Sequence, residues 1–341
     1  MTEVLRQQRR ARTMGLALLA LTAGLLLLGA SVGSTGWQSL RALTRETQAL
    51  QIVWEIRVPR TLGAWLAGAL LGLAGAVAQG LFRNPLADPY LLGSASGAAL
   101  GVALALLLAG LAPASSALAP WLLQLGLTGA AFIGAVAAVL LTLALARGVQ
   151  HTLRLLLAGV VVGVVLGALG SLIMQLAPQV MQTLQAFILG STGFVGWGAC
   201  ALMAAALLLC LIVAWACSHV LDGLALGEAT AASLGLPVAA MRAVLVAVLA
   251  LATATAVAQT GLIGFVGLAA PHLVRAAAKV TYGRLILLAS LMGGVLLTAA
   301  DVLARGLLAP QELPVGVLTA VLGGGYLLWL MHRQGRGGRI T

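Results

Sequence analysis

The side chains that could do chemistry within the apolar part of this chain are few, and Asp301 is the most informative of them. It is the only acidic residue inside a predicted membrane span, where such a group either binds a proton or ion or neutralises a neighbouring charge. Arg305 follows four residues later, one helical turn away on the same face. The spacing predicts a structural ion pair between Asp301 and Arg305, and a proton relay through Asp301 is the alternative.

No pattern typical of a catalytic or nucleotide-binding site accompanies this pair. The zinc pattern HExxH, two carboxylates on one apolar stretch and a Ser-His-Asp set within plausible reach are all absent from the sequence. The only lysine, Lys279, does not follow a glycine, so the P-loop pattern is absent as well. Cys200, Cys210 and Cys217 share one apolar segment and are expected to be packing residues. We predict a chain that is not an enzyme and binds neither a metal nor another cofactor by itself.

The elements that position these residues are predicted to be membrane helices. Of the 341 residues, 61% are hydrophobic and only 8% are charged, against roughly 25% charged residues in an ordinary soluble domain. No Asp, Glu, Lys, Arg or His occurs in residues 89–146 or 155–218. A span takes about 20 apolar residues, so each stretch can hold two or three spans. This pattern excludes a soluble enzyme, a disordered chain and a disulfide scaffold.

Ten candidate spans can be placed along the chain, and the first, which follows four arginines, is longer than a signal-peptide core. The eighth carries Pro271 and is too short to cross a bilayer comfortably, which predicts a half-helix that faces other protein segments. Gly68, Gly72 and Gly75 mark a small-residue face on the second span. The ten spans cover residues 14–33, 60–81, 91–111, 121–146, 155–175, 194–217, 243–260, 262–275, 285–305 and 315–332.

The basic residues predict the orientation of the chain rather than a nucleic-acid partner. The net charge is +11, but the arginines lie between apolar spans and not along one basic face. With the amino terminus inside, the inner segments hold 14 Lys and Arg residues and the outer segments five, as the positive-inside rule requires. We therefore predict one all-α polytopic transmembrane domain over residues 1–341, with about ten helices and both termini in the cytoplasm.

Two predicted inner loops are unusual for simple links. Residues 83–89 read RNPLADP, and the two prolines and Asn84 predict a stiff, non-helical turn. Residues 221–238 form the longest inner loop, in which Gly227 and Gly235 predict two short helices broken at these glycines. A generic amphipathic surface helix is the alternative for the longer loop.

The predicted outer side carries a basic motif and an uncharged polar segment. Residues 57–60 read RVPR, in which Arg57 and Arg60 could anchor lipid phosphates or dock an acidic partner. Residues 177–193 contain several Gln, Ser and Thr side chains but no charge. We expect this segment to line the outer mouth of a path across the membrane.

At these segments the sequence resembles the permease subunits of type II ABC importers for cobalamin, ferric siderophores and haem, the FecCD-type permease family. The similar stretches follow the family's order over almost the whole chain. They are RVPRTLGAWLAGALLGLAGAVAQGLFRNPLADPYLLGSASGAALG (57–101), LRLLLAGV (153–160), LGEATAASLGLPV (226–238), GLIGFVGLAAPHLVR (261–275) and ADVLARGLLAPQELPVGVLTAVLGGGYLLWL (300–330). The resemblance implies a bacterial inner-membrane homodimer with two cytoplasmic ATPase subunits, which bind ATP and Mg²⁺, and a periplasmic substrate-binding protein.

The resemblance also implies three sets of functional residues. The loop 221–238 would transmit the motion of the ATPase, through Leu224, Gly227, Glu228, Leu234 and Gly235. Three arginines would meet acidic residues of the binding protein: Arg57, Arg60 and Arg305. A cytoplasmic gate would comprise Asn84, Leu86, Thr152 and Leu153.

Two of the gate positions differ from the family pattern. Thr152 and Leu153 stand where cobalamin permeases have more polar residues. We expect Leu86 and Leu153 to form an apolar plug across the dimer axis, because small apolar constrictions can close a path by excluding water. Arg83, beside this plug, is expected to anchor the inner leaflet.

The cargo is the least determined property. The uncharged lining expected from residues 177–193 suits a flat, largely apolar porphyrin, so haem is favoured, a ferric siderophore comes next, and cobalamin is the alternative. A secondary transporter driven by an ion and a membrane-embedded enzyme are the rival classes. ATP hydrolysis with a partner ATPase would exclude the secondary transporter, and cargo that passes unaltered would exclude the enzyme.

Overall fold

The computed structural model describes residues 2–33, 36–37, 47–110, 120–146 and 152–337, and almost all of them are helical. A π-helical turn at Val53–Arg57 precedes α4, and β1 (Val32–Gly33) pairs antiparallel with β2 (Gly36–Trp37). The predicted all-α class is therefore confirmed. The helices are α1 (Thr2–Ser31), α3 (Thr47–Ile52), α4 (Val58–Leu81), α5 (Ser94–Gly110), α6 (Pro120–Leu145), α7 (Thr152–Leu176), α8 (Met181–Leu189), α9 (Trp197–Ala216), α10 (Ser218–Ala225), α11 (Glu228–Ser233), α12 (Val238–Thr260), α13 (Val266–Ala277), α14 (Tyr282–Gly306) and α15 (Val315–Gly337).

Within the described residues, seven helices are long and apolar enough to cross a membrane. They comprise α1, α6, α7, α9, α12, α14 and the segment Leu50–Leu81 that contains α4. Two shorter apolar helices are Ser94–Gly110 and Val315–Trp329. Ten spans and cytoplasmic termini stay predictions.

The eighth predicted span is a half-helix, as its glycines and proline indicated. Helix α13 has 12 residues, so it is about 18 Å long at 1.5 Å per residue and too short for a hydrocarbon core of about 30 Å. The chain enters it through Gly261 and Phe265, which both have left-handed backbones, with φ values of 68° and 67°. It packs against α4 and α14 instead of facing lipid alone.

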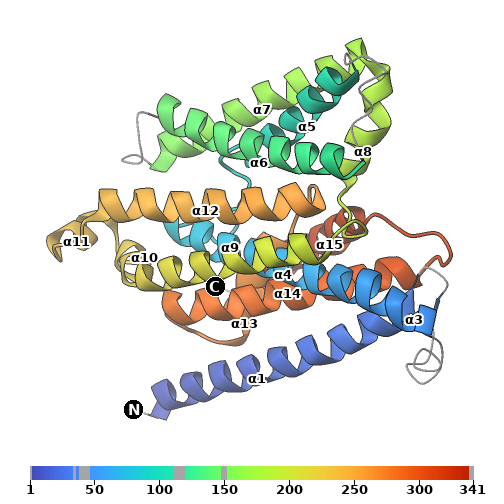
Figure 1. The fold of residues 1–341 in the computed structure, drawn as a ribbon. Helices are drawn as coiled ribbons and strands as arrows, with labels where there is room; N and C mark the ends of the chain where they lie inside the picture. Colours follow the sequence, from blue (N-terminus) through green and yellow to red (C-terminus); the bar gives the residue numbers. More distant parts are fainter. Residues whose placement is uncertain (1, 34–35, 38–46, 111–119, 147–151, 338–341) are drawn as a thin grey trace.

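Helix α4 lies at the centre of the bundle (Figure 1), where it contacts α9, α12, α13 and α14. Its glycines make this position possible. A Cβ at Gly68 or Gly72 would collide with the backbone of α14 at Gly293 or Ala289, and one at Gly75 with the backbone of α13. The predicted small-residue face is thus the surface on which three helix backbones meet, since lipid offers no hydrophobic drive for such packing.

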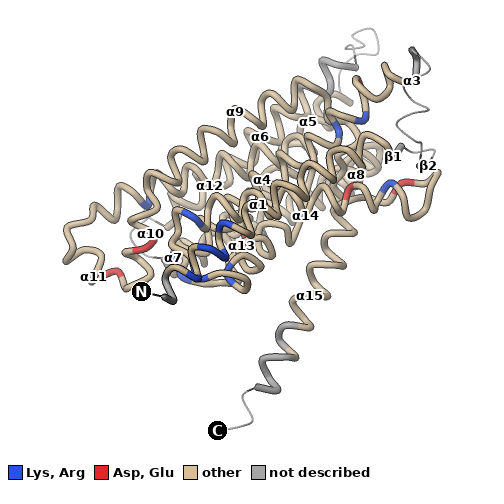
Figure 2. Tube along the Cα trace, turned by 90° about the horizontal axis from the view of Figure 1, so that it is seen from below, with Lys and Arg blue, Asp and Glu red and all other residues tan. Residues whose placement is uncertain are grey.

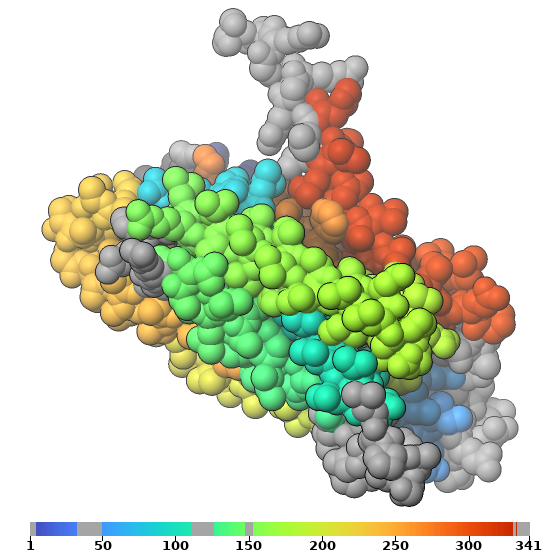
Figure 3. All heavy atoms as spheres, turned by 90° about the horizontal axis from the view of Figure 1, so that it is seen from above, coloured from blue at the N-terminus to red at the C-terminus, as the bar shows by residue number. Residues whose placement is uncertain are grey.

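Helices α5, α6 and α7 form a layer on one side of α12, and α13, α14 and α1 lie on the opposite side of the bundle (Figure 1). Several Lys and Arg residues gather near the amino terminus (Figure 2). There, the backbone N–H of Lys279 donates to the Gln7 side chain at 3.1 Å, which joins the start of α1 to the link between α13 and α14. Helix α15 leaves the bundle beyond its first turns (Figures 2 and 3).

Candidate functional site

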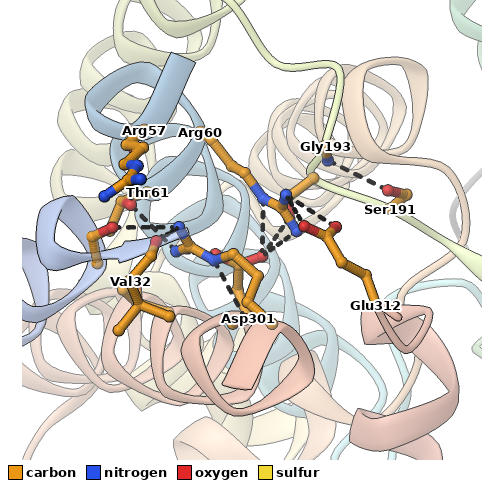
Figure 4. A network of polar contacts seen from close by, with 12 residues as sticks. Val32, Arg57, Arg60, Thr61, Ser191, Gly193, Asp301 and Glu312 are labelled. Carbon is orange, nitrogen blue, oxygen red and sulfur yellow. Dashed lines mark hydrogen bonds and ion pairs between the residues drawn. The ribbon is translucent and has the colours of Figure 1, made fainter. Parts of the chain in front are cut away.

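A network of charged side chains joins the start of α4 to the end of α14 (Figure 4). Its centre is the predicted pair of Asp301 and Arg305 on α14, whose Oδ2 and Nη2 atoms lie 2.5 Å apart. The Asp301 carboxylate also accepts a hydrogen bond from the hydroxyl of Thr192. The structure shows this ion pair, and both residues are sealed from solvent, with exposed fractions of 0% and 1%.

The remaining N–H groups of Arg305 hold the first helix. Nη1 donates to the carbonyl oxygens of Gly29 and Val32, at 3.1 and 3.2 Å, and Nη2 donates to the Thr61 hydroxyl at 3.1 Å. A guanidinium buried in this way cannot meet carboxylates of a second protein in this conformation. In this conformation its contacts join α1, α4 and α14 within the bundle, and a docking role of Arg305 stays a prediction.

The two arginines of the RVPR motif are also turned inward. Arg60 on α4 pairs with Glu312, Nη1 to Oε2 at 2.9 Å, and approaches Asp301 at 3.4 Å. The Arg60 side chain is 12% exposed and that of Glu312 is 32% exposed. Arg57 is 8% exposed and donates from Nη1 to the carbonyl oxygen of Ser31 at 3.5 Å. Arg60, with Glu312, is thus the part of the network that solvent reaches.

The four ion-paired residues of the network are balanced in charge, which explains how they tolerate burial. Arg60 and Arg305 supply two positive charges, and Asp301 and Glu312 supply two negative charges. Buried ions are costly unless they are paired and hydrogen-bonded, and these meet both conditions. Sequence spacing could reveal only the Asp301–Arg305 pair, because the other partners come from distant segments.

The RNPLADP segment forms the stiff turn that its composition predicts. The Asn84 side-chain oxygen accepts a hydrogen bond from the backbone N–H of Leu86 at 2.9 Å, and this turn exposes half of Leu86. Leu153, at the start of α7, is 81% exposed. Thr152 begins the same helix, and its side chain lies outside the described residues. Leu86 and Leu153 are available for a partner, and the plug between them stays a prediction.

Asp88 also orders this turn, a role that sequence reasoning missed. Its Oδ1 atom accepts a hydrogen bond from the backbone N–H of Tyr90 at 2.8 Å. Burial raises the pKa of the Asp88 carboxyl, and this hydrogen bond opposes the rise only in part. The Tyr90 hydroxyl then donates to the carbonyl oxygen of Ile263 at 3.2 Å, which ties the turn to the entry of α13.

The loop 221–238 consists of two short helices separated at the predicted glycines. Helix α10 ends at Ala225 and α11 begins at Glu228; Gly227 and Gly235 have φ values of 116° and 75°. A left-handed backbone strains any side chain other than glycine, so these two positions fix the shape of the loop. The prediction of two broken helices is confirmed.

The coupling residues expected in this loop differ in exposure. Leu234 is 63% exposed, but Leu224 is fully buried and belongs to the hydrophobic core. Leu224 is thus a core residue in this conformation, and its coupling role stays a prediction. Leu226, which was not among the expected residues, is 69% exposed in the same loop. Glu228 is ion-paired with Arg242 of α12 at 3.0 Å and is not a bare surface charge.

A second polar cluster ties the ends of α4, α10, α13 and α14 together. Arg275 of α13 donates to the Gln79 side-chain oxygen, and its guanidinium lies 5.6 Å from the centre of the Tyr282 ring. The Gln79 amide donates to the carbonyl oxygen of Leu268 at 3.2 Å, and the Tyr282 N–H donates to Asp222 at 2.9 Å. Because the partners lie far apart in sequence, no local pattern predicts this cluster.

A cavity of about 300 Å³ opens between α8 and the ends of α6 and α12. Its lining contains no ionisable side chain. Part of the uncharged segment 177–193 does line it, through Thr183, Ala186, Phe187 and Ser191. The other lining residues are Val102, Leu127, Thr128, Phe194, Ala258, Gln259, Thr260 and Gly261.

Comparison with known proteins decides the family. The model of the FecCD transport family matches residues 16–333, from within α1 to within α15. The chain belongs to the FecCD transport family. The resemblance read from the loop motifs is confirmed, and this FecCD permease is a multi-pass protein of the inner membrane.

The similar curated proteins are permeases over their whole length. The vitamin B12 import system permease protein BtuC of Salmonella paratyphi A (strain ATCC 9150 / SARB42) is 39% identical over 340 residues, which cover 97% of this chain and 98% of the relative. The protein of the same name from Salmonella typhi is 38% identical over 340 residues, with the same coverage. This FecCD permease is thus similar to these proteins from end to end.

Two solved structures share its arrangement of helices. A transporter described as being of the metal-chelate ABC type, in an inward-facing conformation, is 27% identical and matches with a TM-score of 0.83 over 93% of this chain and 98% of that chain. PsaBC from Streptococcus pneumoniae, in complex with Fab, matches with a TM-score of 0.58 at 18% identity, over 85% of this chain and 94% of that chain. The second match supports the fold alone, and the first supports an ABC permease.

Proposed function

We propose that this permease is the transmembrane subunit of an ATP-driven importer of cobalamin. The observation that carries this proposal is the 39% identity to a vitamin B12 import permease over 97% of the chain. The expectation that haem is the favoured cargo is corrected, because the relatives support cobalamin better than an iron chelate. The uncharged lining that favoured haem does not discriminate, since the amide-rich rim of cobalamin suits Thr, Ser and Gln side chains equally well.

We further propose that the permease acts as a homodimer. Helix α7 exposes large apolar side chains along its length, among them Leu153, Leu157 and Leu176, which are 66–81% exposed. Helix α15 leaves the bundle and exposes Val321 and Leu328 by 66% and 70%. Surfaces of this kind face either lipid or a second copy, and a projecting helix has little support without a partner. The path would then run between the two copies.

The other partners follow from the class of transporter. Two ATPase subunits would bind the inner end, where Leu226 and Leu234 are exposed beside the left-handed glycines, and would supply the ATP and Mg²⁺ sites. A cobalamin-binding periplasmic protein would dock at the other end. We propose Arg60, with its outward partner Glu312, as the point that its carboxylates reach, whereas Arg57 and Arg305 would support Arg60 from within.

Reconstitution tests this function directly. The permease is placed in liposomes with its ATPase subunits, its binding protein and, in parallel, cobalamin, haem or a ferric siderophore. We expect uptake of cobalamin that requires ATP and persists when ionophores remove ion gradients. Uptake of haem or siderophore in preference to cobalamin would overturn the cargo, and uptake driven by an ion gradient without ATP would overturn the class.

A further inference from the structure

Arg242 is a buried cation at the inner end of α12. It is 3% exposed, and its Nη2 atom lies 3.0 Å from the Oε1 atom of Glu228, the first residue of α11. Glu228 is 47% exposed, so the pair connects the surface of the 221–238 loop with the interior of the bundle. A buried guanidinium is costly unless it is paired and hydrogen-bonded, which makes Glu228 a strongly preferred partner for Arg242.

Helix α11 has few other attachments to the bundle. Ala231 is its buried residue, and Leu236, just beyond it, packs against Gly223 of α10. Most of its remaining side chains are exposed, and Figure 1 shows α11 at the edge of the molecule. The ion pair with Arg242 therefore adds a side-chain link between α11 and α12 to the short segment 234–237 that joins them along the chain.

At its other end, α12 is bonded to the outer mouth. The Thr260 carbonyl oxygen accepts a hydrogen bond from the N–H of Ser191 at 2.8 Å, and the N–H of Leu262 donates to the Phe187 carbonyl oxygen at 3.0 Å. Gly261 allows this approach, because a Cβ there would collide with the Phe187 carbonyl oxygen. The end of α8 and the loop after it are thus fixed to the end of α12.

Helix α12 is suited to carry motion between these two ends. Its 23 residues contain neither Gly nor Pro, the usual sites of kinks. At 1.5 Å per residue it is about 34 Å long, close to the thickness of the hydrocarbon core. A straight helix of this length that is bonded at both ends moves as one body.

We propose that Arg242 is a positioning residue for coupling: its ion pair with Glu228 fixes α11 to α12, so that displacement of α11 by the ATPase moves α8 at the outer mouth. The inference rests on the proposed function, since it assigns the ATPase to α11. This coupling role differs from a merely structural role, in which Glu228 would only stabilise the first turn of α11 through the helix dipole. A structural role affects folding or assembly, whereas the coupling role affects how much cargo moves for each ATP hydrolysed.

The experiment compares three variants with the parent protein. Two are the single variants Arg242→Gln and Glu228→Gln, and the third is a double variant that exchanges the two charges, Glu228→Arg together with Arg242→Glu. Arg284→Gln, at an exposed arginine in the first turn of α14, is the matched control for loss of an inner positive charge. Each variant also carries Gln182→Cys, labelled with a nitroxide on the exposed face of α8. The three native cysteines are buried, so the label is selective. The readouts are cobalamin transported per ATP hydrolysed and the ATP-dependent change in the spin-label signal.

We expect Arg242→Gln and Glu228→Gln to assemble and hydrolyse ATP while cobalamin transported per ATP falls at least about fivefold, the lower end of coupling between two sites. The spin-label signal should stop responding to ATP, and the exchanged pair should recover most of both readouts. Normal transport per ATP in both single variants, or loss without recovery in the exchanged pair, would overturn the inference. If Arg242→Gln fails to assemble, Glu228→Gln decides, because its side chain is exposed. If the parent protein does not couple ATP hydrolysis to cobalamin transport, that result would overturn the proposed function instead.

Discussion

At the scale of single residues, the buried charges are the most sensitive part of this permease. Asp301 is fully buried and accepts hydrogen bonds from Arg305, Arg60 and Thr192. Because each member neutralises another, the loss of one leaves a charge without compensation in a region of low dielectric constant. The cost of a substitution should therefore depend on whether its partner is removed with it.

We predict that Arg305→Met destabilises the permease by about 3–5 kcal/mol, the usual cost of removing one partner of a buried pair. The double variant Arg305→Met with Asp301→Leu should recover much of this loss, because no buried charge is then left without its main partner. Thermal unfolding of the purified proteins in one detergent measures both. Additive losses in the double variant would contradict the interpretation.

We predict that Asp88→Asn increases stability at neutral pH. Burial raises the pKa of Asp88, so the folded protein holds that proton more tightly than the unfolded chain does. The stability of the parent should then fall as pH rises from the ordinary carboxyl pKa through the raised value. Asn keeps the Oδ1 acceptor for Tyr90 and lacks the charge. The melting temperatures of the parent and of Asp88→Asn, measured from pH 4 to 8, should converge at the acidic end. Parallel curves for the two proteins would refute the raised pKa of Asp88.

At the scale of elements, helix packing depends on contacts between backbones. Helix α4 is held between α13 and α14 because glycines stand where these helices cross, at Gly68, Gly72 and Gly75. Helices α5 and α6 cross in the same manner at Gly97 and Gly134. A bundle built in this way tolerates small residues at many positions and strictly requires them at a few.

We predict that Gly72→Ala destabilises the permease by about 1–3 kcal/mol, because the added methyl group overpacks the crossing with α14 at Ala289. Gly126→Ala is the matched control, since a Cβ there meets open space within α6. It should be neutral or stabilising by up to about 1 kcal/mol, as expected for Gly to Ala in a helix. Thermal unfolding in detergent distinguishes the two, and equal losses would contradict backbone contact as the cause.

At the scale of the whole molecule, the proposed homodimer would close its path between two copies of the chain. Leu86 and Leu153 are exposed by 50% and 81% in one copy, which leaves both side chains free to meet a second copy at the inner mouth. The stiffness of the turn comes from the Asn84 side chain and fixes where Leu86 projects. An apolar constriction of this kind closes by excluding water.

We predict that the double variant Leu86→Ala with Leu153→Ala leaks. Liposomes that contain it should lose a trapped small dye without ATP, because truncation removes about 2–5 kcal/mol of packing at each leucine that the proposed dimer buries. Arg83→Ala, at the neighbouring exposed residue, is the control and should stay tight. A tight double variant together with a leaking Arg83→Ala would place the gate elsewhere.

The sequence by itself determined the fold class, the ion pair on α14, the half-helix α13 and the broken loop 221–238. These features depend on hydropathy, helical spacing and the backbone preferences of Gly and Pro, which are all local. Only the tertiary structure decided that Arg305 and Leu224 are buried, because burial depends on which helices cover a residue. Arg60 and Asp301 are 241 positions apart, and Arg275 and Gln79 are 196 positions apart. No local pattern records such pairs, so the polar networks that fix both ends of the bundle emerge only when the chain is folded.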